Sequence, residues 1–254
     1  MSDPTEPSTG ASIGTHRFDR PAVAFAIALP TVVTLVYFVL LAKAPAAMQQ
    51  TAYAIGKTIQ FTFPVIFIWL FHRAGFSRTS VSGISHQRNR QRWTIGVVFG
   101  ILVVVSMAIT WFVFLVGSDI ANAAVERVNE KVAGANLNTP VKFLAIGVFY
   151  SLFHSFLEEY YWRWFVFDQL NSLTTTLKAN LISSAGFASH HVILLATYFG
   201  WGSPLTWLLS FCVGIGGVVW AWLYHDSGRL RIPWVSHLIV DAGIFALGYL
   251  IIFG

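Results

Sequence analysis

Seven long apolar runs constrain the fold of this chain more than any other feature of its sequence. They lie at residues 22–42, 52–71, 94–117, 142–166, 179–199, 204–224 and 232–253. A helix needs about 20 apolar residues to cross the hydrocarbon core of a bilayer. Helices also satisfy their own backbone hydrogen bonds in lipid, which unpaired strands cannot do. The sequence therefore predicts an all-α fold, a transmembrane helical bundle of about seven spans.

The chain has too few charged residues to cover a water-facing surface. Charged residues make up 11% of the sequence and hydrophobic residues 56%, whereas a soluble domain carries about 25% charged residues. Ten Trp and eight Tyr fit two interfacial belts. The arginines that contribute to the net charge of +5 lie in loops between apolar runs, where they favour contact with anionic lipid. We therefore expect membrane lipid as a partner and no nucleic acid.

The basic residues of the short loops predict the orientation of the bundle. Residues 1–16 are rich in Ser, Thr, Pro and Gly, and we expect a disordered cytoplasmic tail there, followed by a single transmembrane domain at 17–254. With seven spans, one side of the bundle holds Arg17, Arg20, Arg73, Arg78, Arg88, Arg90, Arg92, Arg163, Lys178, Arg229 and Arg231. The positive-inside rule then puts the N-terminus in the cytoplasm. On the opposite side, segment 118–141 is compatible with a short interfacial helix.

Ionisable residues inside the apolar runs point to a functional site. A charge at a helix centre costs roughly 3 kcal/mol on insertion scales, so such residues usually face the bundle interior and are paired. Lys57 lies near the start of the second run, where its side chain can reach the interface. The fourth run carries His154, Glu158, Glu159 and Arg163. Glu159 and Arg163 are four apart with the acid first, which favours an ion pair. Glu158 points about 100° away from Glu159, and His154 is one turn before it on the same face.

Two later runs carry histidines at a matching depth. His190 and His191 point about 100° apart, so at most one of them faces a given site. His237 and Asp241 are four apart and share a helix face. A rise of 1.5 Å per residue puts these groups and Glu158 in one layer, about 8–18 Å from the cytoplasmic side. Such a layer suits water activation by a carboxylate, with imidazoles that hold the water and stabilise an oxyanion.

Three motifs in this part of the chain carry a resemblance to a known family. They are EExxxR at 158–163, FxxxH at 187–191 and Hxxx[N/D] at 237–241. In this order, on three late spans, they resemble the CPBP or ABI family of intramembrane proteases, also called type II CAAX prenyl proteases. The resemblance covers about residues 143–245, where the catalytic motifs are expected.

The resemblance implies an intramembrane endopeptidase of the glutamic type that cuts a peptide bond near the cytoplasmic face. It implies that Glu158 is the general base on the hydrolytic water and that His191 is the second ligand of this water. His237 and Asp241 would form the pair on the oxyanion side. Because an ionised Asp241 would repel an oxyanion, this residue must be protonated or must orient His237. His190 could substitute for His191, because the two histidines are adjacent.

Four neighbouring residues are expected to support this site. The resemblance implies that Glu159 and Arg163 lie behind the catalytic groups and fix the helix. His154 is expected to hydrogen-bond to Glu158 and to have a structural role. Phe187 is expected to form a wall of the pocket.

Two other functions stay open from the residues alone. No cofactor is expected and the favoured interpretation is metal-free, but a zinc protease with Glu158, His191 and His237 as ligands is an alternative. A proton- or ion-coupled transporter could use the same groups as a relay. Under the protease interpretation the partner is a peptide or protein substrate. The expected location is a bacterial cytoplasmic membrane, with the chain as a multi-pass protein.

Overall fold

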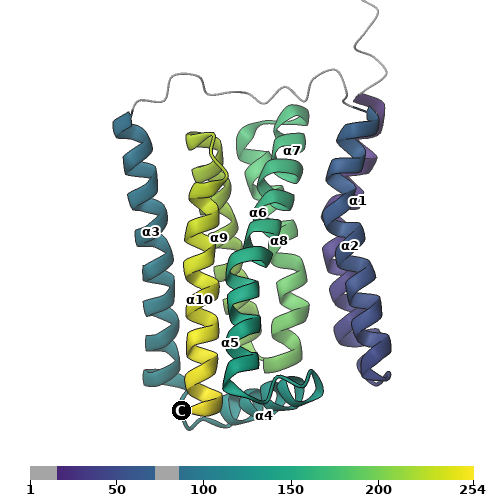
Figure 1. Cartoon of the computed structure of the whole chain (residues 1–254). Coiled ribbons are helices and arrows are strands. Elements are labelled where there is room, and N and C mark those ends of the chain that lie inside the picture. Colours follow the sequence, from purple (N-terminus) through teal and green to yellow (C-terminus); the bar gives the residue numbers. More distant parts are fainter. Residues whose placement is uncertain (1–15, 72–85) are drawn as a thin grey trace, which may run out of the picture.

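A computed structural model describes residues 16–71 and 86–254, and every element in these two ranges is a helix. The candidate membrane spans in them are Asp19–Leu40, Ala46–Phe71, Gln87–Leu115, Pro140–Leu173, Thr176–Phe199, Pro204–Ser227 and Arg231–Phe253. Their helices run side by side in one bundle (Figure 1). The predicted all-α bundle of seven spans is therefore confirmed. Residues 1–15 of the predicted tail lie outside the described residues, as do Arg73 and Arg78, and the orientation remains a prediction.

The first half of the chain supplies three spans and one helix that crosses an end of the bundle. Its elements are α1 (His16–Leu35), η1 (Val36–Leu40), α2 (Ala46–Phe71), α3 (His86–Ile109), η2 (Thr110–Leu115) and α4 (Asp119–Gly134), of which the η elements are π-helical. Helix α4 crosses one end of the bundle, as expected for an interfacial helix (Figure 1). The Ser118 side chain caps it by accepting a hydrogen bond from the Ala121 backbone N–H. Ala121 and Ala124 are buried, whereas Glu126 and Glu130 are exposed.

The second half of the chain contains the fourth span and three long helices. Its elements are α5 (Pro140–Phe149), η3 (Tyr150–His154), α6 (Ser155–Glu159), η4 (Tyr160–Phe167), α7 (Asp168–Leu173), α8 (Thr176–Phe199), α9 (Pro204–Ser227) and α10 (Arg231–Phe253). The first five of these form one continuous span of 34 residues. The predicted end of this span at residue 166 was too early. The apolar run stops near Asp168, but backbone hydrogen bonding carries the helix on to Leu173.

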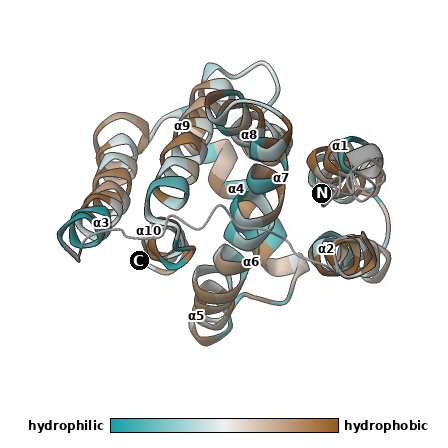
Figure 2. Ribbon diagram, turned by 90° about the horizontal axis from the view of Figure 1, so that it is seen from above, coloured by the Kyte–Doolittle hydropathy of each residue, from teal (hydrophilic) through white to brown (hydrophobic). Residues whose placement is uncertain are grey.

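The bundle is apolar on its outside as well as in its core. The buried core contains large aromatic side chains from η4, α8 and α9, among them Trp162, Phe187 and Trp220. On the outside, Phe114 is 73% exposed and Phe211 is 68% exposed. Figure 2 shows hydrophobic residues along the outward faces of the long helices. Such faces would aggregate in water, but they match the hydrocarbon of a bilayer.

Glycine lets two helices that carry the site approach each other closely. A Cβ atom on Gly217 of α9 would lie 3.0 Å from the Cβ atom of Ser184 on α8. Small residues at such contacts are typical of helix packing in membranes. The close approach brings α8 and α9 together behind the polar layer. Gly228 then ends α9 with φ +61°, a left-handed conformation that glycine adopts without strain.

Helices α1 and α2 form a pair on one side of the bundle (Figure 2). Thr31 of α1 and Ser189 of α8 are hydrogen-bonded through their hydroxyl oxygens, 2.6 Å apart. The Phe61 ring of α2 meets the His154 ring edge to face, with centroids 6.2 Å apart. Because α2 begins at Ala46, Lys57 lies about 16 Å along it. The expectation that the Lys57 side chain reaches the interface stays a prediction.

Candidate active site

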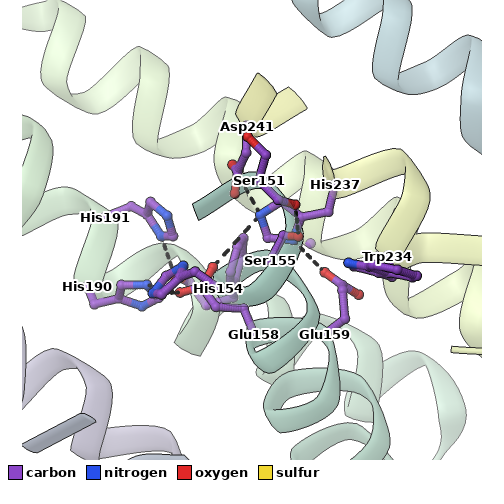
Figure 3. Close-up of polar contacts among 12 residues, drawn as sticks. Ser151, His154, Ser155, Glu158, Glu159, His190, His191, Trp234, His237 and Asp241 are labelled. Atoms are coloured by element: carbon purple, nitrogen blue, oxygen red, sulfur yellow. Dashed lines mark hydrogen bonds and ion pairs between the residues drawn. The ribbon is translucent and has the colours of Figure 1, made fainter. Parts of the chain in front are cut away.

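The polar residues of the later spans converge on one buried cluster. The short helix α6 carries Glu158 and Glu159 between the π-helical segments η3 and η4. Helix α8 contributes His190 and His191 to the cluster, and helix α10 contributes His237 and Asp241. Figure 3 shows the side chains from the three spans turned toward one another. Departures from regular α-helix are frequent at functional sites, and here they flank the two glutamates.

The Glu158 carboxylate lies among three imidazoles. Its Oε1 atom is 3.6 Å from His190 Nε2 and 3.8 Å from His154 Nε2. Its Oε2 atom is 3.8 Å from His237 Nε2. Only 3% of Glu158 is exposed. These distances are longer than those of direct hydrogen bonds.

His237 connects three carboxyl groups through its two ring nitrogens. Its Nδ1 atom is 2.8 Å from Glu159 Oε1, which is the one short hydrogen bond of the ring. Its Nε2 atom is 3.5 Å from Asp241 Oδ1 and faces Glu158 as well. The Trp220 ring stacks on the imidazole, with centroids 4.2 Å apart and planes 13° apart. His237 is thus held by Glu159 and Trp220, and its Nε2 atom faces the centre of the cluster.

The carboxyl group that orients His237 differs from the predicted one. The sequence suggested that Asp241 orients His237, but Glu159 makes the closer contact and binds the other ring nitrogen. Glu158 and Glu159 point in different directions, as expected for neighbours on a helix, yet both reach His237 because the ring lies between them. Asp241 is therefore left on the Nε2 side, next to Glu158.

The predicted ion pair between Glu159 and Arg163 is present and fully buried. Arg163 Nε lies 3.2 Å from Glu159 Oε2. The guanidinium also lies over the rings of Phe187, at 4.7 Å, and Trp220, at 5.3 Å. Arg163 donates a further hydrogen bond of 3.4 Å to the Gly217 carbonyl. Glu159 is therefore neutralised on one side while it binds His237 on the other.

The two adjacent histidines of α8 occupy different places. His190 is buried, faces Glu158 directly and lies parallel to the Trp162 ring, with centroids 6.0 Å apart. His191 Nδ1–H donates a 2.9 Å hydrogen bond to the Phe187 carbonyl. Its ring lies against that of His190, with centroids 4.1 Å apart. His190 thus lies within 4 Å of Glu158, whereas among the described residues no ion pair joins His191 to this carboxylate.

Phe187 lies at the centre of the aromatic wall behind the site. Its ring contacts the rings of His190, His191 and His237, at centroid distances of 5.6, 4.7 and 5.9 Å. With Arg163 over it as well, Phe187 occupies the position of a pocket wall that the sequence suggested. Trp162 and Trp220 have comparable positions, and sequence reasoning missed both. Ten tryptophans in an apolar chain give no signal that singles these two out.

A zinc site needs three or four protein side chains that converge on one point. No group of three or more His, Cys, Asp or Glu side chains within residues 16–71 and 86–254 is arranged to hold a metal ion. The proposed zinc set of Glu158, His191 and His237 is therefore not assembled as a ligand cage here. The cluster as it stands offers carboxylate and imidazole groups for proton transfer and hydrogen bonding.

Comparison with known proteins identifies the region that carries the cluster. Residues 140–243 match the family model described as type II CAAX prenyl endopeptidase, Rce1-like. The match covers the later spans and less than half of the chain, and this segment is similar to that family. No curated protein and no solved structure matches it. The seven apolar helices and this match support an integral multi-pass membrane protein, and the matched family is one of peptidases. The resemblance inferred from the three motifs is thus confirmed, and the matched segment includes every residue of the cluster.

Proposed function

We propose that this membrane endopeptidase is of the glutamic type, with Glu158 as the general base. The observation that carries the proposal is the position of Glu158, buried and surrounded by three imidazole nitrogens at 3.6–3.8 Å. In this position the carboxylate can take a proton from a water molecule held between it and an imidazole.

The proposed reaction proceeds in two steps. Glu158 takes one proton from the water, and the resulting hydroxide bonds to the carbonyl carbon of the substrate peptide. The C–N bond of the tetrahedral intermediate then breaks, and the proton passes from Glu158 to the leaving amine. His191 is the second partner of the water, because its Nδ1 hydrogen bond to Phe187 leaves Nε2 available. His190 and His154 hold the Glu158 carboxylate in place.

His237 and Asp241 are the proposed partners of the oxyanion. With Nδ1–H donated to Glu159, a doubly protonated His237 presents Nε2–H to the developing negative charge. In this role Asp241 carries a proton and donates a second hydrogen bond, since its ionised form would repel the oxyanion. The proposal needs no metal ion.

The substrate is proposed to be a peptide or protein segment that enters from the membrane. The name of the family points to a chain ending in a prenylated cysteine and three further residues. Cleavage near the cytoplasmic face, a bacterial cytoplasmic membrane as the location and one transmembrane domain over residues 17–254 remain parts of this proposal. They depend on the arginine-rich loops and not on the geometry of the site.

A cleavage assay with purified protein in lipid vesicles tests the proposal. The probe is a quenched fluorescent peptide ending in a prenylated cysteine and three residues, with an unprenylated copy beside it. Glu158→Gln is expected to lower kcat about 10³-fold or more, because the amide cannot accept the proton. Glu126→Gln, on the exposed face of α4, is the matched control and should leave the rate unchanged. Full activity of Glu158→Gln would end the proposal.

A metal analysis of the same preparation distinguishes the metal-free mechanism from the zinc alternative. We expect less than one zinc per chain and a rate that chelators do not change. One tightly held zinc per chain, with activity lost on chelation and restored by zinc, would contradict the metal-free mechanism.

A further inference from the structure

Lys57 is a cation inside the bundle with no anionic partner of its own. It lies in the middle of α2, is partly exposed, and has its ammonium 5.6 Å from the Tyr53 ring centroid and 5.4 Å from that of Phe61. Among the described residues, no hydrogen bond or ion pair to its Nζ atom is found. Intramembrane charges are costly and usually have a functional partner.

One contact relates the position of Lys57 to that of the catalytic cluster. The Phe61 ring meets the His154 ring with centroids 6.2 Å apart, so these two residues lie at similar heights in the bundle. Lys57 is one turn before Phe61, and Glu158 is one turn after His154. Helices α2 and α6 both run away from the end covered by α4 (Figure 1). Lys57 and Glu158 are therefore separated by two helical turns, about 11 Å along the bundle.

We propose that Lys57 binds the free carboxylate at the C-terminus of the substrate peptide. An extended peptide of three residues spans about 10 Å, which matches the separation of Lys57 from Glu158. A carboxylate bound at Lys57 thus puts a peptide bond about three residues upstream at the catalytic carboxylate. A compact ammonium between two aromatic rings, with little competing water, suits a single carboxylate. This assignment rests on the proposed function of Glu158.

Neighbouring side chains support a role in substrate binding for this face of α2. Gln60, one turn beyond Lys57, is completely buried, and neither its amide nitrogen nor its amide oxygen has a hydrogen-bond partner. A buried amide without partners is costly, so polar groups of this kind usually satisfy a ligand or water. The α2 face that includes Lys57 and Gln60 therefore offers both charge and hydrogen bonds to a peptide.

The test compares one peptide made with a free C-terminal carboxylate and with a C-terminal amide. Wild type is expected to cleave the acid at least tenfold faster than the amide in kcat/KM, because only the acid pairs with Lys57. Lys57→Met should lower the kcat/KM for the acid peptide to that for the amide peptide. The kcat/KM for the amide peptide should not change. Lys57→Arg should keep most of the preference. Lys43→Met, which removes an exposed lysine outside the site, is the control.

Two results would overturn the assignment. One is equal cleavage of acid and amide by wild type. The other is an equal loss on both peptides in Lys57→Met, which would mean that Lys57 acts through Glu158 and not on the substrate. Binding of both peptides to Glu158→Gln, measured by fluorescence anisotropy, separates this proposal from the hydrolytic one. The Lys57 site is supported if Glu158→Gln binds the acid more tightly than the amide and if this preference is lost when Lys57→Met is added to Glu158→Gln. This result would support the site even if wild type cleaves neither peptide. Equal binding contradicts it.

Discussion

At the scale of single residues, the site depends on which nitrogen of each imidazole is already occupied. His237 uses Nδ1 for Glu159 and His191 uses Nδ1 for the Phe187 carbonyl. Both rings therefore have their Nε2 atoms available for the reaction. The Nε2 atoms of His190 and His237 both face Glu158, at 3.6 and 3.8 Å. His190 is proposed to position this carboxylate, whereas His191 and His237 are proposed to contact the water and the oxyanion.

Replacement of the two adjacent histidines tests this distinction. His191→Ala is expected to lower kcat by about 10²–10⁴-fold, because the water loses its second partner. His190→Ala should cost less, about tenfold, since His154 and His237 still hold Glu158. The measurement is kcat on the fluorescent peptide, with thermal unfolding in detergent as the control for folding. A greater loss in His190→Ala than in His191→Ala would assign the water to His190 instead.

Asp241 offers a second test at this scale. Asp241→Asn should keep activity within about tenfold of wild type, because an amide can donate the same hydrogen bond as a protonated carboxyl group. Asp241→Ala should lower kcat by about 10²–10³-fold through loss of an oxyanion donor. If Asp241→Asn were as inactive as Asp241→Ala, a carboxylate would be required at this position.

At the scale of helices, the site depends on a close approach of α8 to α9. Gly217 permits this approach, and its carbonyl also accepts a hydrogen bond from Arg163. The π-helical segments on both sides of α6 have a comparable effect within one span, because they change the direction of the side chains that precede and follow the glutamates. The geometry of the cluster thus depends on backbone features of two different spans.

Gly217→Ala tests the contact between α8 and α9. Its new Cβ atom would lie 3.0 Å from the Ser184 Cβ and 3.2 Å from the Ser184 Cα, so the two helices must separate. We expect a loss of about 1–3 kcal/mol in stability and a parallel loss of activity. Gly214→Ala is the matched control, because its nearest neighbour would be the Ala188 Cβ at an ordinary 3.6 Å. Equal unfolding temperatures for the two variants would contradict the role of Gly217.

At the scale of the whole molecule, the orientation in the membrane decides which compartment supplies the substrate. Helix α4 covers one end of the bundle, and the arginine-rich ends lie at the other (Figure 1). At that other end Arg88 forms an ion pair with Asp226, with Nη2 and Oδ1 2.6 Å apart, and Arg92 pairs with the same carboxylate. The positive-inside rule predicts that this end faces the cytoplasm.

Cysteine labelling tests the orientation. Cys212 is the only cysteine, so Cys212→Ala gives a background free of thiols. In intact bacterial cells or spheroplasts, a membrane-impermeant maleimide should label Asn122→Cys on α4. Gln87→Cys, at the start of α3, should react only after permeabilisation. The reverse pattern would place the N-terminus outside and contradict cleavage near the cytoplasmic face.

Much of this protein was predictable from sequence because a bilayer leaves the backbone few choices. A long apolar run must be a helix, and charged residues inside it must face the interior, so the seven spans and the three motifs were sufficient to predict the bundle and the cluster. The prediction was less accurate where hydropathy and backbone hydrogen bonding disagree. Hydropathy ended the fourth span at residue 166, whereas the helical hydrogen bonds continue to Leu173.

Only the tertiary structure decided how the groups of the site are paired. Sequence spacing gives the face of a helix, but not the rotation of that helix against its neighbours or the side-chain rotamers. The contact of Glu159 with His237 Nδ1, the choice of His190 to face Glu158 and the inward position of Lys57 all depend on that packing. The sequence by itself determined which polar residues lie in the membrane. The packing of α2, α6, α8 and α10 determined which of them meet, because contacts between spans are set by the fit of their side chains and not by distance along the chain.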